Sequence, residues 1–273
     1  MSSISVIVAT YNGTRQLESC INSIIDDRDE NLEVVIADDG SSNPETLTTI
    51  NRLKSNGFTT IKHAVQKDLG FRLARSRNNA VSISDGEVLL FLDHDILLPK
   101  GFFAELRKCM KTGWFAAGRR VKLDEETTEK LISGDLKPNY VFSFPFALEA
   151  IAKQLEGWRY LFPTRNRSPG KSPQPFRGMS GFCIAVHKKN FLEIDGFDAS
   201  FQGYGVEDWD FLARLNNKGV MGGFLPSRAT VAHLWHNEPE PDFNSPAYKK
   251  LETVEREKIY LPKIGYSKLK HEA

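Results

Sequence analysis

Two aspartates one residue apart, Asp93 and Asp95, directly follow an apolar run at residues 87–92. Hard cations such as Mg²⁺ and Mn²⁺ prefer oxygen ligands and bridge readily to diphosphate oxygens. An Asp-x-Asp at a strand end can equally be turn and helix-capping chemistry. The strongly apolar run before it is typical of a central strand. The pattern therefore favours a metal site over a simple turn.

A second acidic cluster lies at residues 203–211, where a glycine-rich turn leads into Glu207 and Asp208 at the start of an apparent helix. The helix dipole stabilises carboxylates at this position, which is a sufficient structural explanation. The functional interpretation is that one carboxylate acts as a general base and deprotonates an acceptor hydroxyl. Tyr204 and Trp209 offer flat apolar faces for a sugar ring, or else belong to the core.

Two histidines, His233 and His236, stand three positions apart near the end of an apolar segment. Imidazole is a common ligand of first-row transition metals, so either residue could complete a coordination begun by Asp95. The alternative is that both are structural.

Basic residues gather after a weak third strand, at Lys67, Arg72, Arg75 and Arg77. A departing diphosphate needs positive charge to stabilise it, and this group could supply that charge. The alternative is an ordinary solvated helix face.

These clusters need a scaffold, and the first half of the chain predicts one. Short β-branched or apolar runs alternate with stretches of helical periodicity; the expected strands are 4–10, 32–37, 58–64 and 87–92. This β-α-β-α order predicts an α/β fold with a doubly wound, mostly parallel sheet. Ligands bind beyond the carboxyl ends of such strands. Tyr11, Asp39 and Asp93 all follow strand ends, so we expect them to share one crevice.

The second half of the chain is less regular. We expect strands at 114–121 and 178–186, a helix at 205–217 and a loop at 162–177, which is rich in proline and basic residues. No internal repeat or linker is visible. The sequence therefore predicts one domain with two lobes.

Composition excludes several classes of protein. The 273 residues are 40% hydrophobic and 26% charged, as in an ordinary globular protein. The 36 Lys and Arg nearly balance the 35 Asp and Glu, so no large positive net charge favours the binding of nucleic acid. Three scattered cysteines suit a reducing compartment. No run has the length of a membrane span, and the start lacks the pattern of a signal peptide. We therefore expect a cytoplasmic protein.

Several motifs in order resemble the family 2 glycosyltransferases with the GT-A fold. The motifs are ISVIVATYN at 4–12, ADDGSS at 37–42, the stretch 66–78 and Asp93-His94-Asp95. Segments between 178 and 208 are similar to the C-terminal half of bacterial chondroitin polymerase and of β-1,4-galactosyltransferases. The resemblance covers roughly residues 4 to 240.

The resemblance implies a metal-dependent, inverting transfer of sugar from a UDP-sugar to a hydroxyl of a glycan or lipid-linked saccharide, in bacterial surface polysaccharide synthesis. It divides the single GT-A domain, 1–273, into a nucleotide-binding lobe (1–120), an acceptor lobe (121–240) and a helical C-terminal tail (241–273). It also allows a peripheral contact with the inner face of the membrane.

The resemblance assigns roles to residues on both sides of the reaction. On the donor side it implies binding of the nucleoside, the sugar and the diphosphate by Thr10, Tyr11, Asp39, Lys67, Arg72, Arg77 and Asp93. Asp95 would bind Mn²⁺ or Mg²⁺, with His233 as the second ligand and His236 as the alternative. On the acceptor side, Asp208 would be the catalytic base and Glu207 its acceptor-binding neighbour, with Tyr204 and Trp209 contacting the acceptor.

Three other interpretations remain. A nucleotidyltransferase that makes sugar nucleotides also uses a parallel sheet and metal-binding carboxylates, but residues 10–14 contain a single glycine where such enzymes carry a glycine-rich phosphate loop. A retaining glycosyltransferase would keep the class and change the stereochemistry. A catalytically silent carbohydrate-binding module would keep only the fold.

Overall fold

The computed structural model describes residues 2–27, 31–55, 60–162, 176, 178–203, 205–237 and 242–270. Tyr204 and nearly all of the loop expected at 162–177 lie outside these residues.

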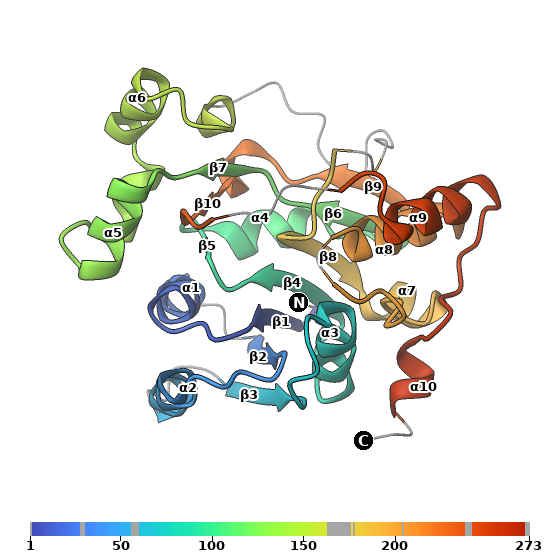
Figure 1. The fold of residues 1–273 in the computed structure, drawn as a ribbon. Helices are drawn as coiled ribbons and strands as arrows, with labels where there is room; N and C mark the ends of the chain where they lie inside the picture. The colour runs from blue at the N-terminus through green and yellow to red at the C-terminus, as the bar shows by residue number, and fades with distance from the viewer. Residues whose placement is uncertain are drawn as a thin grey trace.

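A seven-stranded sheet forms the centre of the molecule, in the order β3-β2-β1-β4-β8-β6-β9 (Figure 1). Its strands are β1 (Ile4–Thr10), β2 (Leu32–Asp38), β3 (Thr60–Val65), β4 (Val88–Asp93), β6 (Trp114–Ala117), β8 (Cys183–His187) and β9 (Met221–Phe224). The four neighbouring strands β3, β2, β1 and β4 pair in parallel, and so do β6 and β9. Strand β8 runs antiparallel to both of its neighbours, β4 and β6. The predicted doubly wound, mostly parallel sheet is therefore confirmed.

Helices cover both faces of this sheet because its strands are apolar on both sides. On β1, Val6 and Val8 pack into one core cluster with residues of α1 (Arg15–Asp26), α2 (Pro44–Ser55) and α4 (Phe102–Cys109). Ile7, between them, points to the opposite face. That face packs against α3 (Leu73–Ser82), α7 (Lys188–Glu193), α8 (Glu207–Asn217) and α10 (Tyr266–Lys270).

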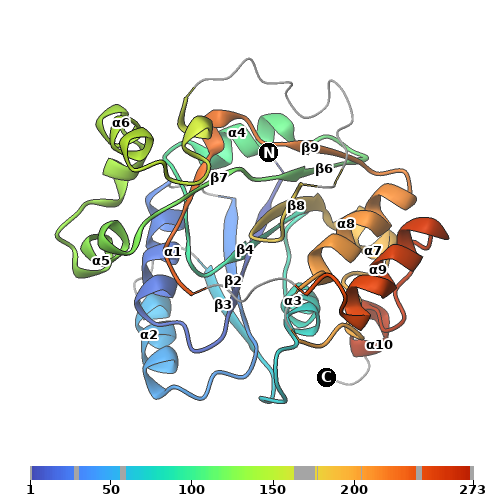
Figure 2. The same cartoon turned by 45° about the horizontal axis from the view of Figure 1, so that its top comes forward.

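A second sheet of three strands has the order β5-β10-β7, with β5 (Ile96–Leu97), β7 (Arg120–Lys122) and β10 (Val231–His233) (Figure 1). Figure 2 shows the chain running on from β6 into β7. The single strand expected at 114–121 is wrong, because the chain leaves the large sheet at Gly118 and continues into the small one. A side chain at Gly118 would collide with Cys183, so glycine permits this close crossing.

Short helices and turns complete the structure. Near the small sheet lie α5 (Glu125–Ser133), η1 (Pro138–Phe142), α6 (Phe144–Ala152), η2 (Trp158–Leu161) and η3 (Ser227–Ala229). Helix α9 (Pro246–Arg256) packs against α8, and α10 packs against α3. Among the described helices, none is long and apolar enough to cross a membrane.

Candidate active site

The carboxyl ends of β1, β2 and β4 lie side by side. The strand register pairs Thr10 with Asp38 and Ala9 with Asp93. The next residue after β2, Asp39, donates its backbone N–H to the Thr10 carbonyl at 2.9 Å. Thr10 is buried, and its hydroxyl has no hydrogen-bond partner. The residues expected to share a crevice are therefore brought together at one edge of the sheet.

Asp39 is held by the chain segment that precedes α3. Its carboxylate accepts the Arg72 backbone N–H at 2.7 Å and the side-chain amide of Gln66. Burial raises the pKa of Asp39, although these two donors partly offset it. The Arg72 guanidinium turns back and donates to the Lys67 carbonyl. Tyr11 lies at the exposed rim of this edge and donates to Asp68 at 3.0 Å.

Arg77 is fully buried on the inner side of α3, so a solvated helix face does not describe it. Its Nη2 donates to Asp93 Oδ1 at 2.9 Å and to the Gly181 carbonyl at 3.3 Å. Its Nη1 lies 3.9 Å from Glu207 Oε1. One guanidinium thus joins the Asp-x-Asp segment to the acidic pair at the start of α8.

Asp95, His233 and His236 converge where the two sheets meet. Asp95 Oδ2 lies 3.4 Å from His233 Nε2 and 3.1 Å from His236 Nε2. Strand pairing sets this contact, because His233 on β10 is opposite Ile96 on β5. Burial alone would raise the pKa of the Asp95 carboxyl, but hydrogen bonds to both imidazoles outweigh it and hold that pKa far below its usual range.

These residues fit a divalent cation. Their ligand atoms lie within 4.8 Å of one another, and no other such group of acidic, histidine or cysteine side chains occurs in the part of the chain that the structure describes. Asp95 Oδ1 is buried with no hydrogen-bond partner, so a lone pair remains for a cation. One carboxylate with imidazole nitrogens suits Mn²⁺ better than Mg²⁺, which prefers oxygen ligands.

The acidic pair opens α8 behind a strained residue, Val206, whose φ of 64° lies in the left-handed region. Burial, and then repulsion from Asp208, raise the pKa of Glu207 to about 8. Burial also raises the pKa of Asp208, while Arg77 and the N–H groups of Trp209 and Gly181 lower it. The pKa values of both carboxyls are therefore raised, and the two groups titrate as a pair.

Gly181 is a site residue that the sequence patterns did not single out. Its backbone N–H donates to Asp208 Oδ2, and a methyl group at this position would lie 2.6 Å from the Asp208 Cβ. The glycine-rich run Gly-Met-Ser-Gly at 178–181 was the available signal. Trp209 is half-buried and donates its indole N–H to the Met179 carbonyl at 2.9 Å. This hydrogen bond therefore connects residues 178–181 to α8.

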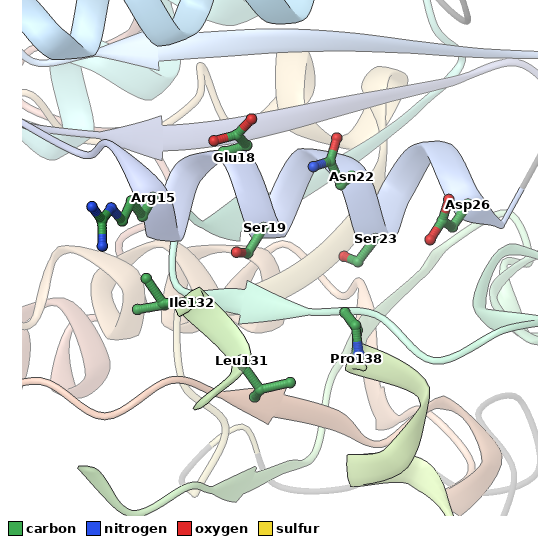
Figure 3. Close-up of a pocket in the computed structure, with 9 residues that line it drawn as sticks. All are labelled: Arg15, Glu18, Ser19, Asn22, Ser23, Asp26, Leu131, Ile132 and Pro138. Carbon is green, nitrogen blue, oxygen red and sulfur yellow. The ribbon is translucent and has the colours of Figure 1, made fainter. Parts of the chain in front are cut away.

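A separate groove lies between α1 and the α5–η1 segment, with a volume of about 310 Å³ (Figure 3). Its lining is mostly polar and includes Arg15, Glu18 and Asn22 from α1, with Leu131 and Pro138 opposite. None of the candidate catalytic, donor-binding or metal residues lines it.

Family models match both halves of the chain. The model for glycosyl transferase family 2 matches residues 5–172, and the model described as the N-terminal domain of galactosyltransferase matches residues 164–237.

Curated relatives carry glycosyltransferase names. Chondroitin synthase of Pasteurella multocida is 26% identical over 248 residues, covering 86% of this chain and 25% of that protein. GalNAc(5)-diNAcBac-PP-undecaprenol beta-1,3-glucosyltransferase of Campylobacter jejuni is 30% identical over 209 residues, covering 77% of this chain and 59% of that protein. The chain therefore spans between a quarter and three fifths of the length of these two relatives.

Solved glycosyltransferases share the fold. S. aureus TarS 1–349 in complex with UDP-GlcNAc superposes with a TM-score of 0.61 at 15% identity, covering 98% of this chain and 69% of that one. The mannosyltransferase PcManGT from Pyrobaculum calidifontis, in complex with GDP-Man and Mn²⁺, gives 0.58 at 16% identity, covering 87% and 58%. The predicted GT-A fold is confirmed, and the chain belongs to glycosyl transferase family 2.

Proposed function

We propose that the chain is a metal-dependent, inverting glycosyltransferase that moves a sugar from a UDP-sugar to a hydroxyl of a glycan or lipid-linked saccharide. One observation carries the proposal: the buried Arg77 side chain contacts both Asp93 and Glu207. The Asp-x-Asp segment and the acidic pair therefore flank a single site, as a transfer between donor and acceptor requires.

The donor side is the edge formed by β1, β2 and β4. Thr10, Tyr11 and Asp39 would hold the nucleoside, since the buried Thr10 hydroxyl lacks a partner and Asp39 lies beside it. Lys67 and Arg72, on the loop beside Asp39, would face the diphosphate. The complex of TarS with UDP-GlcNAc supports a uridine nucleotide, while the complex of PcManGT with GDP-Man shows that the fold admits another base.

Asp95, His233 and His236 would hold the cation, and Mn²⁺ fits this set better than Mg²⁺. A cation bound there would neutralise the charge that develops on the departing diphosphate. The complex of PcManGT with Mn²⁺ supports a divalent cation in this fold.

The acceptor side is the N-terminus of α8. Asp208 would accept the proton of the acceptor hydroxyl as that oxygen attacks the anomeric carbon. Burial raises the pKa of Glu207, and its protonated carboxyl would donate a hydrogen bond to the acceptor. Trp209 would line the acceptor path, and Tyr204 stays a sequence prediction for the same role. Attack on the face opposite the diphosphate inverts the anomeric centre.

The acceptor class is supported by the relatives' names, which include a chondroitin synthase and a glucosyltransferase acting on a diphosphoundecaprenol-linked saccharide. We propose that the chain serves bacterial surface polysaccharide synthesis at the cytoplasmic face of the membrane. Within the single domain, residues 1–120 would bind the nucleotide and residues 121–240 the acceptor, followed by a helical tail at 241–273.

The test is a screen for nucleotide release with common UDP-sugars and GDP-sugars, with Mn²⁺, with Mg²⁺ and with EDTA. We expect Mn²⁺-dependent UDP release from one UDP-sugar, abolished by Asp208→Asn and with inverted product stereochemistry by NMR. GDP release alone would overturn the uridine assignment, and retention would overturn the mechanism. Pyrophosphate release from nucleoside triphosphate and sugar phosphate would favour a nucleotidyltransferase instead.

A further inference from the structure

We propose that Arg77 is a positioning residue for the catalytic base: it keeps the Glu207–Asp208 pair at a single negative charge and oriented toward the acceptor, and it does not bind the donor diphosphate. This inference rests on the proposed function, because it assumes that Asp208 accepts the acceptor proton. It replaces the donor-binding role that the resemblance implied for Arg77.

The geometry around Arg77 leaves no path to a diphosphate. The side chain is 1% exposed, and one face of the guanidinium lies 5.3 Å from the centre of the Phe197 ring. Its Nη2 is already used by Asp93 and by the Gly181 carbonyl. A ligand that large would have to displace both contacts and separate α3 from the sheet. Lys67 is exposed and does not have this obstacle.

Nη1 of Arg77 lies toward the acidic pair. Nη1 is buried, lies 3.9 Å from Glu207 Oε1 and makes no hydrogen bond, while Glu207 Oε2 is also buried without a partner. A shift of less than about 1 Å would convert this ion pair into a charge-assisted hydrogen bond. Arg77 and Asp208 also share one short segment, since Gly181 accepts from Arg77 through its carbonyl and donates to Asp208 through its N–H.

The charges around the pair leave Arg77 as its main counter-ion. Asp93, at the end of β4, repels both carboxylates, and the N–H groups of Gly181 and Trp209 carry no net charge. On α8 itself, Arg214 is joined to Asp210 at 2.7 Å. Without Arg77, only these uncharged N–H groups would oppose burial and mutual repulsion, so the pKa of the pair should rise.

The direction of the effect on pH dependence follows from this charge. A base must be deprotonated to act, so the rate rises with pH through the pKa of the pair. A cation within 4–6 Å lowers a carboxyl pKa by about one to three units. Removing the charge of Arg77 should therefore move the acid limb of the rate profile to higher pH by about one unit or more.

The decisive variant is Arg77→Met, compared with Arg77→Lys and with Arg119→Met. Arg119 is a matched control, because it is a partly buried arginine that donates to the Leu225 carbonyl and has no assigned role in the site. The assays are kcat against pH with the UDP-sugar that gives the most UDP release, and calorimetric binding of UDP in the presence of Mn²⁺.

We expect Arg77→Met to shift the acid limb upward while the Kd of UDP changes by less than about threefold. We expect the acid limb of Arg77→Lys to lie close to the wild-type pH, and that of Arg119→Met to be unchanged. Either an unshifted acid limb or UDP binding weakened tenfold or more would overturn the inference. The second result would support a donor-binding role for Arg77. Wild-type protein without nucleotide release would instead refute the proposed function.

A second variant keeps the inference testable if Arg77→Met does not fold. Arg77→Gln removes the positive charge but keeps a polar side chain that can donate a hydrogen bond. Its acid limb should also lie at higher pH than that of the wild type, with the Kd of UDP changed by less than about threefold. An acid limb at the wild-type position would contradict the role given to Arg77.

Discussion

Replacement of Gly181 by alanine adds one methyl group directly beside the proposed base. The Gly181 backbone is not left-handed, so alanine can adopt it, and the N–H that donates to Asp208 is retained. The new Cβ would lie 2.6 Å from the Asp208 Cβ and 2.7 Å from its Oδ2, whereas ordinary contact begins at 3.4 Å. Asp208 must therefore move by about 0.8 Å, the difference between 2.6 and 3.4 Å.

A displacement of about 1 Å in a catalytic group can reduce the rate about 100-fold, which corresponds to roughly 2.7 kcal/mol in the barrier. Overpacking should also lower the free energy of unfolding by about 1–3 kcal/mol. Gly222→Ala is the matched control, because a Cβ at Gly222 on β9 would collide with the Phe115 ring, away from the site. Both variants should lose stability, but Gly181→Ala alone should lose turnover.

The assay is kcat for UDP release under saturating donor, together with the thermal midpoint of each variant. A Gly181→Ala enzyme that keeps kcat within threefold of the wild type, while its midpoint falls as in Gly222→Ala, would refute the reasoning. It would mean that Asp208 either moves freely or does not act as the base.

Three further predictions concern the cation, an acid-sensitive contact and a helix cap. Asp95→Asn should weaken Mn²⁺ binding by more than about 100-fold and His236→Ala by less, since His236 lies at the exposed side of the group; calorimetry with equal affinity for all three proteins would contradict this. Lys250 and backbone N–H groups outweigh burial and lower the pKa of Asp198 from 3.8 to about 2, so its contribution of about 2 kcal/mol is complete above pH 4 and lost as the pH falls toward 2. Urea unfolding of Asp198→Asn should therefore show a deficit at pH 7 that vanishes near pH 2, and a deficit constant with pH would count against it. Asp124 caps α5 by accepting the Thr127 N–H at 2.9 Å, so Asp124→Ala should lower the free energy of unfolding by about 1–2 kcal/mol. An unchanged thermal midpoint would show that this cap does not stabilise the protein.

The donor half of the fold could be predicted because its signals are local. The runs that form β1, β2 and β4 are continuous and apolar, and each ends in polar residues at a strand terminus. Parallel strands then place those ends together without further information. The ordering of Thr10, Asp39 and Asp93 along one edge follows from this rule alone.

The small sheet could not be predicted because its strands are too short to show a period. β5 has two residues and β10 has three, and their pairing joins segments that lie far apart in the chain. The choice between His233 and His236 as the partner of Asp95 depends on that pairing. The structure brings both imidazoles to Asp95, which no spacing argument indicated.

Arg77 shows a different limit of the sequence. It stands among exposed or partly exposed cations, Lys67, Arg72 and Arg75, and carries the same charge. Only the packing of α3 against the large sheet and the start of α8 makes it the buried member of the group. Its burial is a property of tertiary contact, so composition and periodicity do not reveal it.

The pairing of β5 with β10 has a consequence for biosynthesis. Asp95 leaves the ribosome long before His233, and at 5–20 residues per second the intervening chain takes roughly 7–28 s to make. Before residue 207 emerges, strands β1 to β4 are present, but Asp95 lacks both His233 and His236, and Arg77 lacks the Glu207–Asp208 pair. Under the proposed function, the nascent chain could therefore neither bind a cation at this site nor deprotonate an acceptor until residues 207–236 have emerged.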